Sequence, residues 1–363
     1  MNSGLRIAFL VLFAVVAGSA SAYAAAGAVY TESNSTSGNV IYVFNRSEGG
    51  GLISLRPGGF PTGGSGSGGG FENQGALAID DANRFLFAVN AGSNTISVFR
   101  ILENGLALVE VDSSAGKRPI SLTVKNNFLY VLNNGAQVSD VDSVAGFSVS
   151  ENGHLTPIAS GLHLSGSNVG PTQIGFNSEG NLLIVTERFT NLIDVFTVDP
   201  NGTASGPNVF PSAGSGPFGF AFGKRGQVIV SESAGSVSSY SVSRSGSLGT
   251  ISGAIGNGQV ATCWLVLSSD NRYGYVTNTG SGNASSYTVA FEGTLRLLNA
   301  VGADLGSGSH PLDTALSNDA RYVYFLTTGS GSIQGYSVVT NGSLTPVAKA
   351  LGIPFSATGL VAR

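Results

Sequence analysis

The stretch that decides the fold is Pro354-Phe355-Ser356-Ala357-Thr358-Gly359-Leu360-Val361, close to the C-terminus. It reads like two stretches from the middle of the chain, Pro171-Thr172-Gln173-Ile174-Gly175-Phe176 and Pro217-Phe218-Gly219-Phe220-Ala221-Phe222. Each of those two stretches opens a repeated unit of short expected strands. The C-terminal copy opens no unit of its own, and the first unit of the chain lacks an opening strand.

The repeated unit contains four expected strands, and their alternation of apolar and polar residues is typical of strands with two different faces. The clearest marker is an apolar second strand of the type YV-N. A third strand follows a Gly/Ser/Asn turn, and a fourth commonly follows Asn-Gly, a preferred hairpin signal. The period of roughly 43 to 53 residues lies in the range of propeller blades. Six complete units carry the marker, at Phe87-Ala88-Val89-Asn90, Tyr130-Val131-Leu132-Asn133, Leu183-Ile184-Val185-Thr186, Val228-Ile229-Val230-Ser231, Tyr275-Val276-Thr277-Asn278 and Tyr324-Phe325-Leu326-Thr327.

The remaining N-terminal segment supplies three strands of a seventh unit. Ala28-Val29-Tyr30-Thr31-Glu32 matches a second strand, Val40-Ile41-Tyr42-Val43-Phe44 a third and Leu52-Ile53-Ser54-Leu55 a fourth. We expect the C-terminal stretch to complete this blade, since closing the ring removes the exposed sheet edges of an open array. The sequence therefore predicts an all-β, seven-bladed β-propeller with four-stranded blades. Two unrelated sheet domains would not predict this match between the two ends.

The N-terminus predicts export. A basic start is followed by an apolar run from Ile7 to Gly18, which is too short for an ordinary transmembrane helix. It ends in the small residues Ser19-Ala20-Ser21-Ala22, which are typical of a signal-peptide cleavage site. We expect a signal peptide over 1–26 and the propeller over 27–363, secreted or periplasmic and without a membrane span after cleavage. An uncleaved anchor is the alternative.

The composition narrows the function classes. Charged residues make up 10% of the chain and hydrophobic residues 42%, which argues against intrinsic disorder. The net charge of −4 provides no basic footprint for nucleic acid. Cys263 is the single cysteine, so no disulfide can form within the chain. We expect a monomer that binds no nucleic acid.

A glycine-rich segment, 57–70, interrupts the repeat between the first two blades and is expected to be a flexible loop. A phosphate cradle is not expected there, because no strand-to-helix junction or Lys-Ser/Thr pair accompanies it. Five N-x-S/T sites would carry glycans in a eukaryotic host: Asn34, Asn45, Asn201, Asn283 and Asn341.

The predicted topology indicates where a site would lie. The first strand of each blade lines the central channel and the second returns antiparallel, so the start of strand one and the end of strand two share a mouth. Function usually resides on such loops. The strand-one starts carry Arg118, Gln173, Phe218, Trp264 and His310. The strand-two ends carry Glu32, Asn90, Asn133, Glu187 with Arg188, Glu232, Asn278 and Thr328.

These residue types suggest roles. Glu187 and Glu232 belong to adjacent blades, and nearby carboxylates can split their pKa values and supply an acid or a base. His310 is placed for proton transfer near neutral pH, and Asp313 lies on the same strand. Arg118 and Arg188 could hold an anionic substrate. The same polar residues could instead cap backbone groups between blades. The further substrate-binding candidates are Gln173, Trp264, Asn90, Asn133 and Asn278.

Metal and organic cofactors are not expected. His154 lies in a hairpin and His163 in a long loop, so the three histidines and one cysteine are scattered and do not form a structural zinc site. The chain has neither a C-x-x-C-H haem motif nor a G-x-S-x-G nucleophile elbow.

The YV-N strand, the N-G-x-L hairpin and the seven-blade closure resemble the lactonase-type seven-bladed propellers, a family that includes a 6-phosphogluconolactonase and fungal carboxy-muconate cyclases. The resemblance covers the chain from about Ala28 to Arg363. It implies acidic and arginine residues, and in the cyclases a histidine, around the channel mouth. Glu187 with Arg188, and Glu232 in Val230-Ser231-Glu232, match positions of that kind. The stretches that resemble a secreted subgroup are 170–176, 185–188, 217–222 and Cys263-Trp264.

Two functions follow as expectations. The first is an exported enzyme that hydrolyses or forms a small, carboxylate-bearing lactone at the channel mouth. The second is a non-catalytic propeller, outside the cell or at its surface, that binds a ligand, partner or glycan. The second is favoured by the low charge and by the openings of the fourth and fifth blades, Pro171-Thr172-Gln173 and Pro217-Phe218-Gly219, which carry no histidine.

Overall fold

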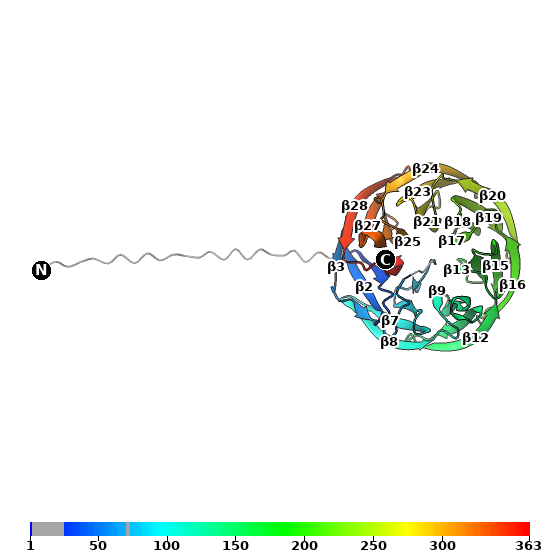
Figure 1. The fold of residues 1–363 in the computed structure, drawn as a ribbon, viewed down its shortest axis with the longest axis horizontal. Coiled ribbons are helices and arrows are strands. Elements are labelled where there is room, and N and C mark those ends of the chain that lie inside the picture. The colour runs from blue at the N-terminus through cyan, green and yellow to red at the C-terminus, as the bar shows by residue number, and fades with distance from the viewer. Residues whose placement is uncertain (2–24, 70–72) are drawn as a thin grey trace.

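The structure is a computed structural model that describes residues 1, 25–69 and 73–363. Seven sheets are arranged around a central axis, and the C-terminus lies near the middle of the ring (Figure 1). The seven-bladed propeller predicted from the repeat is therefore confirmed. The expected signal peptide lies almost entirely in residues 2–24, outside the described residues, and stays a prediction.

Each blade has its first strand at the axis and its last strand at the rim. Blade 1 combines both chain ends in the order β29 (Thr358–Ala362), β1 (Gly27–Glu32), β2 (Val40–Arg46) and β3 (Leu52–Ser54), and β4 (Phe60–Pro61) also pairs with β2. The other blades follow the chain: β5 (Leu77–Ile79), β6 (Phe85–Asn90), β7 (Thr95–Leu102) and β8 (Gly105–Ser113) in blade 2; β9 (Pro119–Lys125), β10 (Phe128–Asn134), β11 (Asp142–Val149) and β12 (Leu155–His163) in blade 3; β13 (Pro171–Phe176), β14 (Leu182–Glu187), β15 (Leu192–Val198) and β16 (Ala204–Pro211) in blade 4.

The second half of the ring repeats this order. Its strands are β17 (Pro217–Phe222), β18 (Gln227–Glu232), β19 (Ser236–Val242) and β20 (Leu248–Gly256) in blade 5; β21 (Thr262–Leu267), β22 (Tyr273–Asn278), β23 (Asn283–Val289) and β24 (Leu295–Asp304) in blade 6; β25 (Pro311–Leu316), β26 (Tyr322–Thr327), β27 (Ser332–Val338) and β28 (Leu344–Leu351) in blade 7. Two 3-10 turns, η1 (Gly135–Val138) and η2 (Thr328–Ser330), follow second strands at the mouth. Within the described residues, no helix has the length and hydropathy to cross a membrane.

The ring closes as the sequence predicts. β29 pairs antiparallel with β1, with Val29 opposite Ala362 and Tyr30 opposite Val361. Arg46, only 2% exposed, reinforces the junction by donating to the carbonyls of Ala26 (3.0 Å) and Arg363 (3.4 Å) and to the carboxylate of Asp319 in blade 7 (3.0 Å). One guanidinium therefore ties both described ends of the propeller to the neighbouring blade.

The core lies between the blades, and the repeat motif explains how it is held. Tyr130, Tyr275 and Tyr324 occupy the same position of the YV-N strand in blades 3, 6 and 7. Each hydroxyl donates to the carbonyl of the hairpin glycine of the following blade, at Gly202, Gly342 and Gly50 respectively. All three glycines have a positive φ, in the left-handed region where a side chain is disfavoured. In blades 3 and 6, the marker strand and the N-G turn of the following blade are thus the two halves of one contact between blades.

The described part of the glycine-rich segment lies between blades 1 and 2, as expected, and is fixed by hydrogen bonds. The amide of Ser67 donates to Asn34 Oδ1 at 2.7 Å, the amide of Gly66 donates to the Ser35 carbonyl at 2.7 Å, and that of Gly92 donates to the Ser65 carbonyl at 2.9 Å. The loop therefore covers the gap between the first two blades on the mouth side.

Removing β29 tests the closure. A chain that ends at Ser356 leaves the edge of β1 unpaired and removes Leu360, which is buried in the intact ring. We expect its Tm to fall by roughly 10 °C or more, because a lost core leucine alone costs several kcal/mol. Differential scanning calorimetry measures this. The full chain keeps both β29 and the Arg363 carbonyl and is the reference, and equal Tm values for the two chains would contradict the proposed dependence on closure.

Candidate functional site

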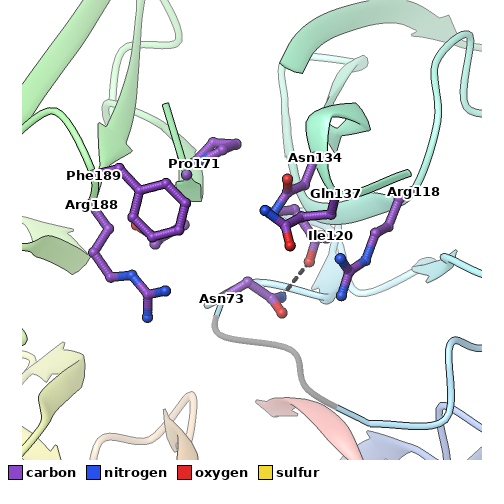
Figure 2. Close-up of a pocket in the computed structure, with 10 residues that line it drawn as sticks. Asn73, Arg118, Ile120, Asn134, Gln137, Pro171, Arg188 and Phe189 are labelled. Carbon is purple, nitrogen blue, oxygen red and sulfur yellow. Dashed lines mark hydrogen bonds between the residues drawn. The ribbon is translucent and has the colours of Figure 1, made fainter. Parts of the chain in front are cut away.

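A cleft opens at the channel mouth between blades 3 and 4, and Figure 2 shows two arginines on opposite sides of it. Arg118 directly precedes β9 and Arg188 directly follows β14. The enclosed volume is about 60 Å³. That space accommodates a small head group such as a carboxylate, while a larger ligand would extend into the open mouth. The lining residues are Asn73, Arg118, Ile120, Asn134, Gln137, Gly170, Pro171, Thr172, Arg188 and Phe189.

Both guanidinium groups are half-buried, and this burial lowers their pKa values from the ordinary arginine value. Arg188 also lies over the ring of Phe189, with 5.0 Å between the guanidinium carbon and the ring centroid. Desolvation weakens each cation's interaction with water, and a negative ligand between the two would restore favourable electrostatics. The arrangement therefore suits anion binding.

Two carboxamides add acceptors to the cleft. Asn73 Oδ1 and Asn134 Oδ1 are buried, and neither has a hydrogen-bond partner among the described residues. A buried acceptor without a donor costs free energy, and a ligand hydroxyl could supply that donor. The cleft thus combines cationic donors for an acid group with acceptors for hydroxyls.

Arg118 has an unusual backbone. In blades 3 to 7, the residue just before strand one has a left-handed conformation, with φ of 54° at Arg118, 61° at Gly170, 69° at Gly216, 57° at Ala261 and 44° at His310. In blades 3 to 6, the carbonyl of this residue accepts a hydrogen bond from a backbone amide at or just after the end of strand two. The donors are the amides of Asn134, Arg188, Ser233 and Thr279. Glycine is the residue that adopts this conformation without strain. Arg118 and His310 therefore carry large side chains at a backbone conformation that favours glycine.

The channel below the cleft is crossed by Asn73 and Gln74, ahead of the short strand β5. The Trp264 indole donates to the Asn73 carbonyl at 2.5 Å, and the side chain of Gln74 bonds both the amide and the carbonyl of Leu265 at 3.0 Å. On the opposite side, Ser121 Oγ donates to the Gln74 carbonyl at 2.6 Å. We call residues Asn73 and Gln74 the crossing segment. It links blades 3 and 6 and divides the channel in two.

Trp264 and Phe218, two of the residues at strand-one starts, belong to the support of this segment. Trp264 is 2% exposed and packs edge-on against Phe218, with ring centroids 5.0 Å apart. Gly219 gives the room the segment needs, because a Cβ there would overlap Gln74 Oε1 and lie 2.6 Å from the Cys263 carbonyl. Trp264 therefore does not line the cleft, and its predicted contact with substrate has no support in this arrangement.

The predicted catalytic carboxylates lie inside the blades. Glu187 and Glu232 are fully buried and are not among the residues that line the cleft. Glu187 accepts hydrogen bonds from the Ser165 hydroxyl (2.5 Å) and the Thr190 hydroxyl (2.6 Å), and Glu232 accepts one from the Ser236 hydroxyl (2.5 Å). These hydrogen bonds hold the neighbouring loops in place, which is the structural role given above as the alternative to catalysis. The structure thus does not bring the two carboxylates together with the arginines around one ligand space.

The amides predicted to bind substrate follow the same pattern. Asn90, Asn133 and Asn278 lie at the ends of the second strands of their blades and are fully buried. Asn90 and Asn278 bond serine hydroxyls of the third strand, at Ser97 (2.7 Å) and Ser285 (2.8 Å). Asn133 donates to the Ser114 carbonyl. Glu32 occupies this position in blade 1 and accepts from Asn39. The strand-two ends thus form a buried polar layer below the mouth.

Gln173 and His310 lie apart from the cleft as well. Gln173 bonds the amide and carbonyl of Phe220 and so connects blades 4 and 5. His310 is exposed at the mouth of blade 7, and its ring centroid lies 6.3 Å from that of Phe355. Of the predicted site residues, the cleft therefore gathers Arg118 and Arg188 only. In the described part of the chain, no three His, Cys, Asp or Glu side chains cluster in a way that could hold a metal ion.

Sequence reasoning missed Asn73, Asn134, Gln137 and Phe189. Asn134 and Phe189 each lie one residue beyond a recognised mouth position, next to Asn133 and Arg188, and the turn η1 brings in Gln137. The strand pattern therefore contained a usable signal for these residues. Asn73 follows the glycine-rich segment, and nothing in the repeat indicates that the chain crosses the channel there.

The arrangement defines a class of protein: a seven-bladed propeller with a cationic mouth cleft over a closed channel. The chain belongs to a family described as lactonase, seven-bladed β-propeller, whose model matches residues 37–166, 119–204 and 231–358. No curated protein matches the chain.

Solved structures share the fold at low sequence identity. A putative 6-phosphogluconolactonase from Bacteroides fragilis is 20% identical, with a TM-score of 0.75 over 93% of this chain and 98% of that one. The periplasmic gluconolactonase of Pseudomonas aeruginosa is 19% identical, with a TM-score of 0.74 and the same coverage. A protein from Lactobacillus plantarum is 16% identical, with a TM-score of 0.73 over 93% of this chain and 99% of that one. At these identities the likeness concerns the fold.

Replacing Gly219 tests the crossing segment. Gly219→Ala places a methyl group against Gln74, so we expect a loss of about 1–3 kcal/mol in stability. We also expect a change in the emission of Trp264, the chain's single tryptophan. Thermal unfolding and fluorescence measure the two effects. Gly274→Ala is the control, because its Cβ would meet Leu267 at an ordinary 3.4 Å. An unchanged emission in Gly219→Ala would contradict the described packing.

The buried pair of Glu187 and Asp194 makes stability depend on pH. Burial first, and then the neighbouring Glu187, raise the pKa of Asp194 to about 8. An aspartate in the unfolded chain has a pKa of about 3.9, so the folded state binds more protons between about pH 4 and pH 8, and stability falls as pH rises through that range. The amide of Ser165 donates to both side chains at 3.0 Å, which holds them close together.

Asp194→Asn removes this dependence. We expect the variant to be more stable than the wild type at pH 8, with a Tm higher by several degrees, and to differ little from it at pH 4. Thermal unfolding across this pH range measures the effect, and the exposed Asp140→Asn is the control. A constant difference at all pH values would show that the proton of Asp194 is not the cause.

Proposed function

We propose that the chain is an exported lactonase-like hydrolase that binds a small, carboxylate-bearing lactone at the channel mouth. The observation that carries the proposal is the convergence of Arg118 and Arg188 on one cleft. Membership of the lactonase family supports the reaction type. The apolar N-terminal run with its small-residue end supports export.

The cleft also suits the rest of such a substrate. Its enclosed space takes the acid group, and the acceptors of Asn73 and Asn134 can receive hydrogen bonds from ring hydroxyls. One structural relative is described as a periplasmic gluconolactonase, and gluconolactone is a hydroxylated lactone. We therefore infer that the substrate carries both hydroxyls and a carboxylate.

Hydrolysis would proceed by addition of water to the lactone carbonyl, followed by cleavage of the ring ester bond. The product is an open-chain hydroxy acid, and the ring oxygen leaves with a proton as the new hydroxyl. One arginine would hold the substrate's carboxylate, and the other would stabilise the negative oxygen that develops on the carbonyl. His310, exposed on the same mouth, remains our candidate for proton transfer.

Non-catalytic binding of the same kind of ligand is the second candidate. It is favoured by one observation, the burial of Glu187 and Glu232 in hydrogen bonds away from the cleft. Arginines and amides alone would still bind a hydroxy acid. The two candidates share a ligand class and differ in turnover.

Substituting the arginines tests both candidates. Two probes are used: an aldaric-acid monolactone, which carries a carboxylate, and the neutral gluconolactone. We expect the wild type to prefer the charged probe, and we expect Arg118→Met and Arg188→Met each to lower kcat/KM for it by about 100-fold or more, the loss typical of a missing oxyanion donor. A pH-stat assay measures hydrolysis, and calorimetry measures binding of the product acid.

The exposed Arg296→Met, on the outer strand of blade 6, removes the same charge away from the mouth and is the control. Binding of the acid without turnover, lost in both cleft variants, would favour the binding protein over the enzyme. Hydrolysis at equal rates by wild type and both cleft variants would refute the arginine cleft as the site.

A further inference from the structure

The channel below the crossing segment is a second, larger cavity that the mouth site does not use. Its volume is about 480 Å³, within the range of small-molecule pockets. Gln74 contributes to its upper end, and the lower halves of the inner strands β5, β9, β13 and β17 contribute most of its wall. Since Asn73 lines the mouth cleft, the two spaces lie on opposite sides of the crossing segment.

The cavity exists because the inner strands carry small side chains at one level. Strand pairing places Thr123, Gly175 and Ala221 at equivalent positions, two residues further along their strands than Ser121, Gln173 and Gly219. The earlier level is filled by the crossing segment. The later level has nothing comparable to fill it, so the channel stays open there.

The wall of the cavity is mixed, with slightly more apolar than polar surface. Phe176 and Phe222 lie at the ends of β13 and β17 and are partly exposed, although the blades have buried most of their other aromatic side chains. Leu122, Val124 and Ile174 extend the same surface. Aromatic and branched aliphatic walls are typical of pockets that bury a small apolar ligand.

The two ionisable residues among those that line the cavity already have partners. Lys125 pairs with Asp81 at 3.0 Å. Asp313 is 2% exposed, and its two carboxylate oxygens accept the amides of Thr314 (2.7 Å) and Leu360 (3.0 Å). Burial raises the pKa of Asp313 well above its usual value, which favours the uncharged carboxyl. Lys125 is therefore the charged group among the described lining residues, and Asp81 already pairs with it.

From these observations we propose that the lower channel, from Gln74 to Phe176 and Phe222, is a binding site for a small, uncharged and largely apolar molecule. Polar anchors are few: the Thr123 hydroxyl already accepts the amide of Phe176 at 3.2 Å, and the side chain of Gln173 is bonded to Phe220. Affinity would come mainly from apolar area removed from water. The site is independent of the arginine cleft, and its ligand belongs to a different chemical class.

The uncharged fluorescent probe N-phenylnaphthylamine tests the site in the full chain. We expect saturable binding with an increase in emission as the probe leaves water. Ala221→Trp fills the cavity, and we expect it to weaken binding by about tenfold or more, equivalent to about 1.4 kcal/mol. Val301→Trp is the control, because Val301 is exposed on the outer strand β24 of blade 6 and adds the same bulk away from the channel. We expect its affinity to stay within about twofold of the wild type.

A second variant and a structure guard against misfolding. Phe222→Ala removes one aromatic wall without adding bulk, and we expect a smaller but measurable loss of affinity. A crystal structure with the probe should show it below Gln74. Absence of saturable binding, equal losses in Ala221→Trp and Val301→Trp, or a probe seated at the arginine cleft would each overturn the proposal.

Discussion

The pairing of β29 with β1 is the constraint on which the rest of the molecule depends. Seven sheets can bury their faces only against one another, so the ring needs every blade complete and both ends of the chain in one sheet. Arg46 strengthens this junction from within, since its guanidinium bonds the carbonyls of Ala26 and Arg363 and the carboxylate of Asp319. A break there would expose an edge strand and release blade 7 from blade 1. The channel, its mouth and its two cavities exist because this junction holds.

The crossing segment adds a second constraint at the axis. The seven inner strands surround a channel that their side chains do not fill. Asn73 and Gln74 fill one level of this channel and form hydrogen bonds to blades 3 and 6. The mouth cleft above consequently has a polar floor, whereas aromatic and aliphatic side chains form part of the wall of the lower cavity. One short segment thus separates two environments that suit different ligands, an anion above and a neutral molecule below.

The fold was predictable because the same four-strand pattern recurs along the chain. The site was predictable only in part. Topology correctly brought the strand-one starts and strand-two ends to the same mouth, and Arg118 and Arg188 do meet there. It did not distinguish the last residue of strand two, which turns into the blade, from the next one, which faces the cleft. Glu187 is buried and Arg188 lines the site for that reason. Asn73 could not be predicted, because it lies in a connection that no other blade repeats.

The left-handed residue before the inner strand recurs in blades 3 to 7, whatever its side chain. Glycine occupies this position in blades 4 and 5 and adopts it freely, whereas a side chain there costs free energy, on the order of 1 kcal/mol. Arg118 has this conformation and lines the cleft. His310 lies outside the cleft: its ring makes no hydrogen bond among the described residues, and its aromatic neighbour is the exposed Phe355. Ala261 holds the same conformation in blade 6 with only a methyl group, so the backbone at this position does not by itself require a functional side chain. His310 therefore stays a candidate for proton transfer only because it is exposed at the mouth.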